Sequence, residues 1–168
     1  MNELLALLVT LALQHGAMPP GMTHEQHHEH MAKDAALEKR GALAMGFDQH
    51  KTTHHFLSSA TGGSIEVEVN DPADSTSRDQ VRSHLKEIAS AFANGDFEKP
   101  FQTHAEVPPG VPAMQRLKSA IRYIYEQTDR GGAVRISTSD PEALRAIHEF
   151  LDYQGKEHHS DHPPAVRK

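Results

Sequence analysis

The chain has 168 residues, a formal net charge of −6 and no cysteine. The acidic charge argues against a nucleic-acid-binding protein, which would carry a basic surface. The lack of thiols excludes disulfides, cysteine metal ligands and cysteine nucleophiles. Histidine is the unusual component, with 14 residues. Such enrichment is typical of metal-binding segments, and also of pH-sensitive polar tails.

The first apolar stretch, residues 4–13, contains no charge. It is too short to span a bilayer, and its length fits the apolar region of a signal peptide. The signal is atypical, since no basic side chain precedes it and no Ala-x-Ala cleavage motif follows. A buried helix is the alternative. We expect residues 1–17 to be a signal peptide that is removed on export to the periplasm or the exterior, after which no membrane span is left.

Residues 18–45 combine a Pro-rich linker with a predicted helix that ends before Gly46. Thr23 and Gln26 form a capping-box pattern at its start. Four side chains share one helix face, because they are spaced i, i+3, i+4 and i+7: His24, His27, His28 and Met31. Imidazoles four residues apart can chelate one ion, and methionine adds a soft ligand suited to Cu(I). The segment is either a metal-binding arm or a solvated polar helix.

A β-hairpin is predicted directly after the arm. Residues 50–58 and 64–70 are rich in β-branched and aromatic side chains, and the Ala-Thr-Gly-Gly between them provides a turn. A helix follows, with Thr76 or Ser77 as its N-cap and Gly95 directly after its end.

A Pro-rich connector, residues 96–112, leads to a second unit of the same kind. Alternating side chains predict strands over residues 119–127 and 133–138. The final helix has Pro141 at its first position and is predicted to end at Gly155.

The order of these elements is an N-terminal helix followed by two ββα units. We therefore expect an α+β fold, in which the two units form a four-stranded antiparallel sheet with the helices on one face. Residues 62–72 and 131–141 share a Gly pair, a strand and an Asp-Pro, which suggests an internal duplication. Residues 46–156 would form this single domain, and residues 157–168 a disordered His-rich tail.

Histidines of the predicted domain could form a metal site. Alternate side chains of a strand share a face, so His54 would face the helices together with Phe56 and meet His84 or His148 there. Two or three neutral imidazoles suit Zn(II) or Cu(II). The alternative for each ring is a half-buried histidine that hydrogen-bonds a backbone carbonyl. The candidate ligands are His54, His55, His84, His104 and His148 in the domain and His24, His27, His28 and Met31 in the arm.

These features favour an exported protein that binds copper or zinc for buffering, resistance or delivery over an enzyme. The composition resembles that of periplasmic copper-handling proteins with His/Met-rich arms, a likeness that implies no particular fold. Metal affinity should fall as the pH drops through about 6.5, because an imidazole must be neutral to bind a metal.

Two other classes of function stay open. A metal-dependent enzyme would place its histidine site between the first hairpin, with His54, and the Pro-rich connector, with His104. A non-catalytic interaction module would bind no metal at micromolar concentrations. Haem is disfavoured because the chain has no Cys-x-x-Cys-His motif and few aromatic side chains. The sequence indicates metal ions as partners, no nucleic acid, and no particular protein.

Overall fold

The computed structural model describes Thr23, Glu25, Gln26 and residues 45–158. The chain divides into two compact units, Met1–Asp34 and Ala35–Lys168. In the first unit, the backbone N–H of Gln26 donates to Thr23 Oγ1, and the N–H of Thr23 donates to Gln26 Oε1. This reciprocal pair is the predicted capping box. Glu25, Gln26 and Met45 of the predicted N-terminal helix are described and are helical, and its other residues after Thr23 lie outside the described residues.

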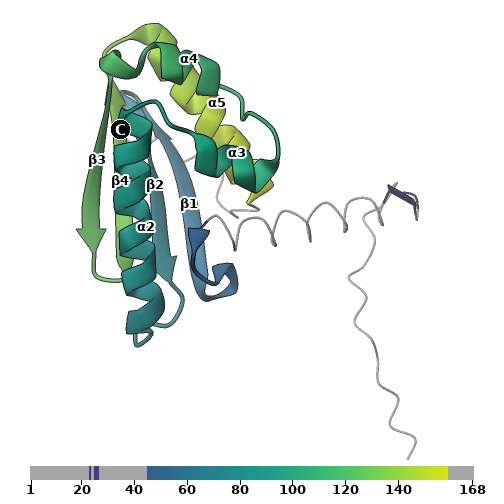
Figure 1. The fold of residues 1–168 in the computed structure, drawn as a ribbon, viewed down its shortest axis with the longest axis vertical. Coiled ribbons are helices and arrows are strands. Elements are labelled where there is room, and N and C mark those ends of the chain that lie inside the picture. Colours follow the sequence, from purple (N-terminus) through teal and green to yellow (C-terminus); the bar gives the residue numbers. More distant parts are fainter. Residues whose placement is uncertain (1–22, 24, 27–44, 159–168) are drawn as a thin grey trace, which may run out of the picture. The chain divides into compact units, whose positions relative to one another are not determined.

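The second unit is built on a four-stranded antiparallel sheet, which confirms the predicted α+β architecture (Figure 1). Strands β1 (Thr52–Ser59) and β2 (Gly62–Val69) form the first hairpin, and β3 (Ile121–Thr128) and β4 (Gly131–Thr138) form the second. The second strands of the two hairpins pair with each other, so the order is β1-β2-β4-β3.

Helices α2 (Ser75–Ala93) and α5 (Pro141–Glu157) follow the two hairpins and lie on one face of the sheet (Figure 1). An aspartate is the N-cap of each helix. Asp74 accepts the backbone N–H of Ser77, and Asp140 accepts two N–H groups of the first turn of α5. The cap of α2 therefore precedes the position predicted from the sequence. None of the described helices is both long and apolar enough to cross a membrane.

Each of these two helices packs mainly over the hairpin of the other unit. Helix α2 contacts β4 and β3, whereas α5 contacts β1 and β2. The side chain of His54 on β1 consequently lies near the end of α5, which is more than 80 residues away in the sequence. The two ββα units are thus interlocked rather than placed side by side.

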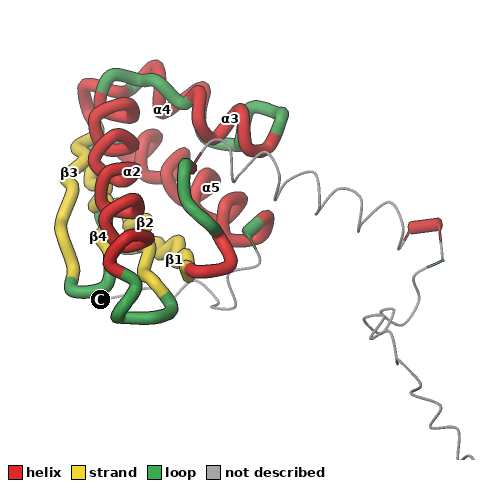
Figure 2. Tube along the Cα trace, turned by 60° about the horizontal axis from the view of Figure 1, so that its bottom comes forward, coloured by secondary structure: helices red, strands yellow, loops and turns green. Residues whose placement is uncertain are grey.

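The connector between α2 and β3 contains two short helices, α3 (Glu98–His104) and α4 (Val111–Arg116). Pro100 obscured α3, but it lies in the first turn, where a proline removes no intrahelical hydrogen bond. Helix α4 packs against α5 (Figure 2).

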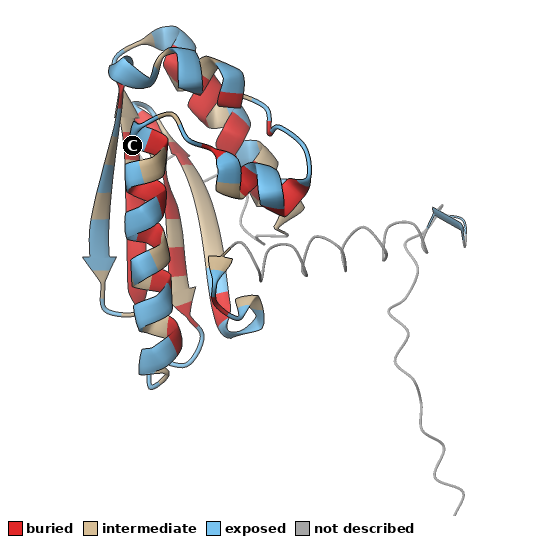
Figure 3. Cartoon of the chain, viewed as in Figure 1, coloured by how far each residue is buried: buried red, intermediate tan, exposed pale blue. Residues whose placement is uncertain are grey.

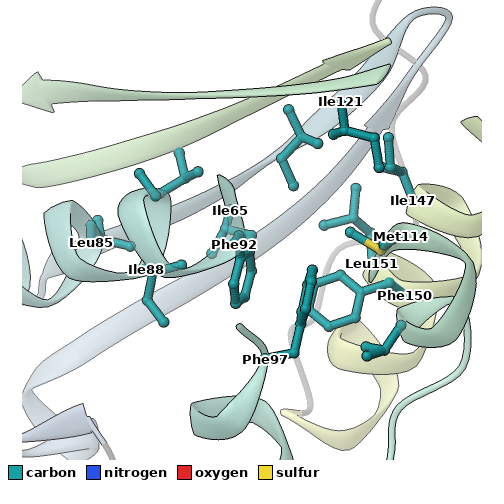
Figure 4. Packing of buried hydrophobic residues seen from close by; sticks show 14 of the residues in the cluster. Ile65, Leu85, Ile88, Phe92, Phe97, Met114, Ile121, Ile147, Phe150 and Leu151 are labelled. Atoms are coloured by element: carbon teal, nitrogen blue, oxygen red, sulfur yellow. The ribbon is translucent and has the colours of Figure 1, made fainter. Parts of the chain in front are cut away.

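The hydrophobic core fills the space between the sheet and the helices. The buried residues lie on the two central strands and on the inner sides of α2 and α5 (Figure 3). Phe97, directly before α3, is only 4% exposed. Its ring stacks on Phe92 with the centroids 4.3 Å apart and meets Phe150 edge-on at 5.9 Å (Figure 4). The connector is therefore anchored in the core.

The two Gly pairs lie in the second strand of each hairpin, not in the turns as predicted. A Cβ added at Gly63 would lie 2.3 Å from the carbonyl oxygen of Leu57 and 2.4 Å from Leu151 of α5. A Cβ at Gly132 would lie 3.2 Å from Leu85 of α2. The glycines thus allow each helix to approach the sheet closely.

Replacing Gly63 with alanine should lower the free energy of unfolding by about 1–3 kcal/mol, because the new methyl group meets a strand carbonyl that cannot move without disturbing the β1–β2 ladder. Urea denaturation followed by circular dichroism measures the change. The control is Ser137→Ala in β4, which should change stability by less than about 0.5 kcal/mol. Equal stability of the two variants would contradict the close approach.

Candidate functional site

A cavity of about 60 Å³ lies between β1, α2, α3 and the end of α5. Most of its wall is apolar and is formed by Met45, Phe56, Ile65, Val67, Ile88, Phe92 and Phe150. Four histidines from four different segments also line it: His54, His84, His104 and His158. Since one water needs roughly 10–15 Å³ of such volume, the cavity admits a few water-sized groups.

His54 faces the helices from β1, as its alternation with Phe56 predicted. Its ring lies between other rings: the centroid of Phe47 is 5.9 Å away and that of His158 is 5.7 Å away, both nearly parallel to it. Burial lowers the pKa of His54 from 6.5 to about 4, and neighbouring His55 contributes. The ring is therefore neutral at pH 7 and carries a lone pair on one nitrogen.

His84 reaches the same cavity from α2, so the predicted meeting of His54 with a helix histidine occurs here. The edge of its ring meets Phe47, with the centroids 5.4 Å apart. Burial lowers the pKa of His84 to about 4, and the positive charge of Lys99 adds to the effect. Its buried Nδ1 has no hydrogen-bond partner among the described residues.

His104 enters the cavity from α3 and is 8% exposed. Its Nε2 lies 2.9 Å from Gln154 Oε1. An amide oxygen can only accept, so Nε2 carries a proton and donates it to Gln154. Metal-binding histidines are commonly held in this way, with the second ring N–H donated to a buried oxygen.

His158 was assigned to the tail by the sequence, which placed the helix end at Gly155. The structure continues α5 to Glu157 and makes His158 its C-cap, with its backbone N–H donating to the carbonyl of Gln154. Its ring centroid lies 5.7 Å from that of His54 and 5.3 Å from that of His104. The missed signal was spacing: His158 follows Leu151 by seven residues and so lies on the same face of α5.

The other predicted ligands lie elsewhere. His55 points to the sheet face opposite the helices, because it alternates with His54 and Phe56. His148 does not meet His54. Its Nε2 lies 2.9 Å from the carbonyl oxygen of Ser59 and 3.1 Å from that of Gly62. His148 is therefore a histidine that hydrogen-bonds the backbone, which was the alternative to a metal ligand. The arm ligands His24, His27, His28 and Met31 lie outside the described residues.

Within the described part of the chain, no group of three or more His, Asp or Glu side chains is already arranged to hold a metal ion. The ring centroid of His158 lies 5.7 Å from that of His54 and 5.3 Å from that of His104. Two imidazoles bound to the same ion through bonds of about 2 Å have centroids roughly 5–6 Å apart.

Comparison of the chain with protein-family models, with curated protein sequences and with solved structures finds no match.

The metal-free protein should lose stability as the pH falls from 6.5 to 4. Histidines of the unfolded chain take up protons near pH 6.5, whereas His54 and His84 stay neutral in the fold down to about pH 4. The unfolded state therefore binds more protons in this window, at a cost of about 3 kcal/mol per histidine at most. Urea denaturation in EDTA at several pH values measures the slope.

The variants His54→Gln and His84→Gln should each flatten this slope, because glutamine does not titrate. His55→Gln, on the opposite face of the same strand, should flatten it less, because His55 makes only the smaller contribution to the lowered pKa of His54. If all three variants keep the pH dependence of stability that the unsubstituted protein has, the buried rings do not cause it.

Proposed function

We propose that the protein binds a transition-metal ion through His54, His104 and His158, and that it serves in copper or zinc buffering, resistance or delivery outside the cytoplasm. The observation that carries this proposal is the meeting of three imidazoles from three separate elements at one cavity, with His158 5.7 Å and 5.3 Å from its two partners. The apolar segment at residues 4–13 supports export to the periplasm or the exterior.

Ordinary aromatic packing also places rings at such distances, so two further features support metal binding. His54 is held neutral by burial, with its pKa lowered to about 4, and a neutral imidazole can bind a cation without first losing a proton. His104 donates its Nε2 proton to Gln154, which orients the ring at the cavity. Three imidazoles are a ligand set that suits Zn(II) and Cu(II).

The predicted arm and the tail, which carry further histidines, directly adjoin residues of the cavity wall in the sequence. Residues 18–44 precede Met45, and the tail with His159 and His162 follows His158. In the proposed function, the arm and the tail capture ions at low affinity and pass them by ligand exchange to the buried centre.

A metal-dependent enzyme is the second candidate. One observation favours it: His54 of the first hairpin and His104 of the connector line the same cavity. A catalytic zinc site has three protein ligands and keeps its fourth position for water or substrate, and three imidazoles fit that description. Turnover of a substrate by the zinc-loaded protein, lost on replacing His104, would favour the enzyme over the carrier.

Removal of residues 18–44 should leave one tightly bound zinc ion and remove the weaker, exchangeable ones. The reason is that the buried centre draws all its ligands from the described domain. Metal content after dialysis and competition with a chromophoric chelator measure stoichiometry and affinity. Loss of all zinc with the arm would contradict the buried centre.

In the same titration, His54→Gln or His104→Gln should weaken the tight site by at least about 100-fold, because a ligand contributes more than a supporting residue, whose loss costs about 10–100-fold. The matched control is His55→Gln, which removes an adjacent histidine of the same strand that faces away from the cavity. An equal effect of His54→Gln and His55→Gln would refute the assignment.

A further inference from the structure

Strand β3 forms one edge of the sheet, because it pairs only with β4 (Figures 1 and 2). It is eight residues long, lies in unbroken register with β4, and contains no proline or lysine. Proteins commonly use prolines, lysines or bulges to prevent an exposed edge from pairing with another chain. The β3 edge has none of these, and Ile124 near its middle is 44% exposed. The edge is therefore suited to pairing with a further strand.

The backbone groups that point out of this edge belong to alternate residues. The N–H of Thr138 on β4 donates to the carbonyl of Thr61 in the first hairpin, so the even-numbered residues of β4 bond toward β2 and the odd-numbered ones toward β3. Each odd-numbered residue of β4 pairs with an even-numbered residue of β3. The outward N–H groups of β3 are consequently those of odd-numbered residues, including Tyr123, Tyr125 and Gln127.

The even-numbered side chains of β3 lie on the sheet face opposite the helices and run from Arg122 through Ile124 to Glu126. The carboxylate of Glu126 lies 2.9 Å from Nε of Arg135, whose Nη1 lies 2.6 Å from Glu66. Two carboxylates thus share one guanidinium. Arg122 is exposed and makes no ion pair within the described part of the chain. The edge therefore offers a cation, an apolar side chain and an anion in a row.

An antiparallel pairing of β3 with a second β3, centred on Ile124, matches this row. It places Arg122 of each copy opposite Glu126 of the other and brings the two Ile124 side chains together. Opposite charges directly across a strand pair are stabilising, and like charges are destabilising. A pairing centred on Arg122 or Glu126 would set like charges against each other. One centred on Tyr123 or Tyr125 would set Ile124 against a charge, so the pattern selects a single register.

We propose that β3 binds β3 of a second copy of this chain, so that the two sheets join into one about a two-fold axis at Ile124. Tyr123 of each copy exchanges backbone hydrogen bonds with Tyr125 of the other. Because the same surface is used by both copies, the assembly closes at a dimer. The opposite edge, β1, carries no Asp, Glu, Lys or Arg that could select a register in this way. A single strand pair buries little surface, so we expect a dissociation constant in the micromolar range.

Sedimentation velocity of the full-length protein, at concentrations from about 1 to 500 µM, measures the association. EDTA is present throughout, so that metal ions cannot link the histidines of two molecules. Ile124→Lys should raise the dissociation constant at least about tenfold, because two like charges then meet at the axis. The matched control is Leu57→Lys, at the far end of the same row of cross-strand neighbours, which should leave it unchanged. A monomer at every concentration, or equal effects of the two variants, would overturn the proposal.

Charge reversal tests the register. Arg122→Glu and Glu126→Lys should each weaken self-association about tenfold or more, since like charges then meet twice about the axis. An equal mixture of the two variants should dimerise again, because every cross-strand pair of the mixed dimer joins opposite charges. Arg135 keeps its ion pair with Glu66 in both variants. Failure of the mixture to associate, with both variants folded by circular dichroism, would overturn the proposed pairing.

Hydrogen exchange followed by NMR on the unsubstituted protein gives a test that needs no variant. The N–H groups of Tyr123 and Tyr125 should exchange more slowly at a protein concentration where the dimer dominates than at one where the monomer does. The N–H of Ile124, already bonded to β4, should change less. Equal exchange of Tyr123 and Tyr125 at the two concentrations would contradict pairing through this edge.

Discussion

The packing of Phe97 against Phe92 and Phe150 is the constraint on which the candidate site depends. These rings anchor the connector in the core immediately before α3 begins, and α3 carries His104 and Lys99. Without that anchor the connector would be an open loop, and the cavity would lack one of its walls. A contact that is purely apolar therefore sets the position of the polar groups for which we propose a chemical role.

Enclosing polar side chains in this cavity has an energetic cost. Burial keeps His54 and His84 neutral and leaves Gln154 Nε2 without an acceptor among the described residues. A domain selected for stability alone would favour apolar side chains at such positions, because a buried polar group that is only partly satisfied is destabilising. Native proteins tolerate departures of this kind chiefly at functional sites. In this domain they also occur away from the cavity, for example at the buried hydroxyl groups of Tyr123 and Tyr125.

Periodicity and turn residues were enough to predict the sheet, the two main helices and the inward orientation of His54 and His84, because these follow from local spacing. Tertiary contacts decided the rest. The enzyme alternative placed His104 opposite His54, but the sequence offered no way to prefer that position, because the connector is held by Phe97. The end of α5 was misjudged because Gly155 is tolerated inside the helix. The ring of His148 hydrogen-bonds the carbonyl oxygens of Ser59 and Gly62, which flank the β1–β2 turn. This contact exists only because α5 packs over the first hairpin. The Gly pairs were predicted as turns because nothing in the local sequence shows that a helix lies against them.

The most direct test of the central claim is NMR of the histidine rings, with long-range ¹H–¹⁵N correlation spectra recorded before and after one equivalent of zinc(II). Each ring nitrogen reports separately on protonation and metal binding. If these three histidines bind the ion, the rings of His54, His104 and His158 shift together and those of His55 and His148 do not. Unchanged rings in the cavity, or a shift at His55 or His148 instead, would contradict a metal centre built from these three histidines.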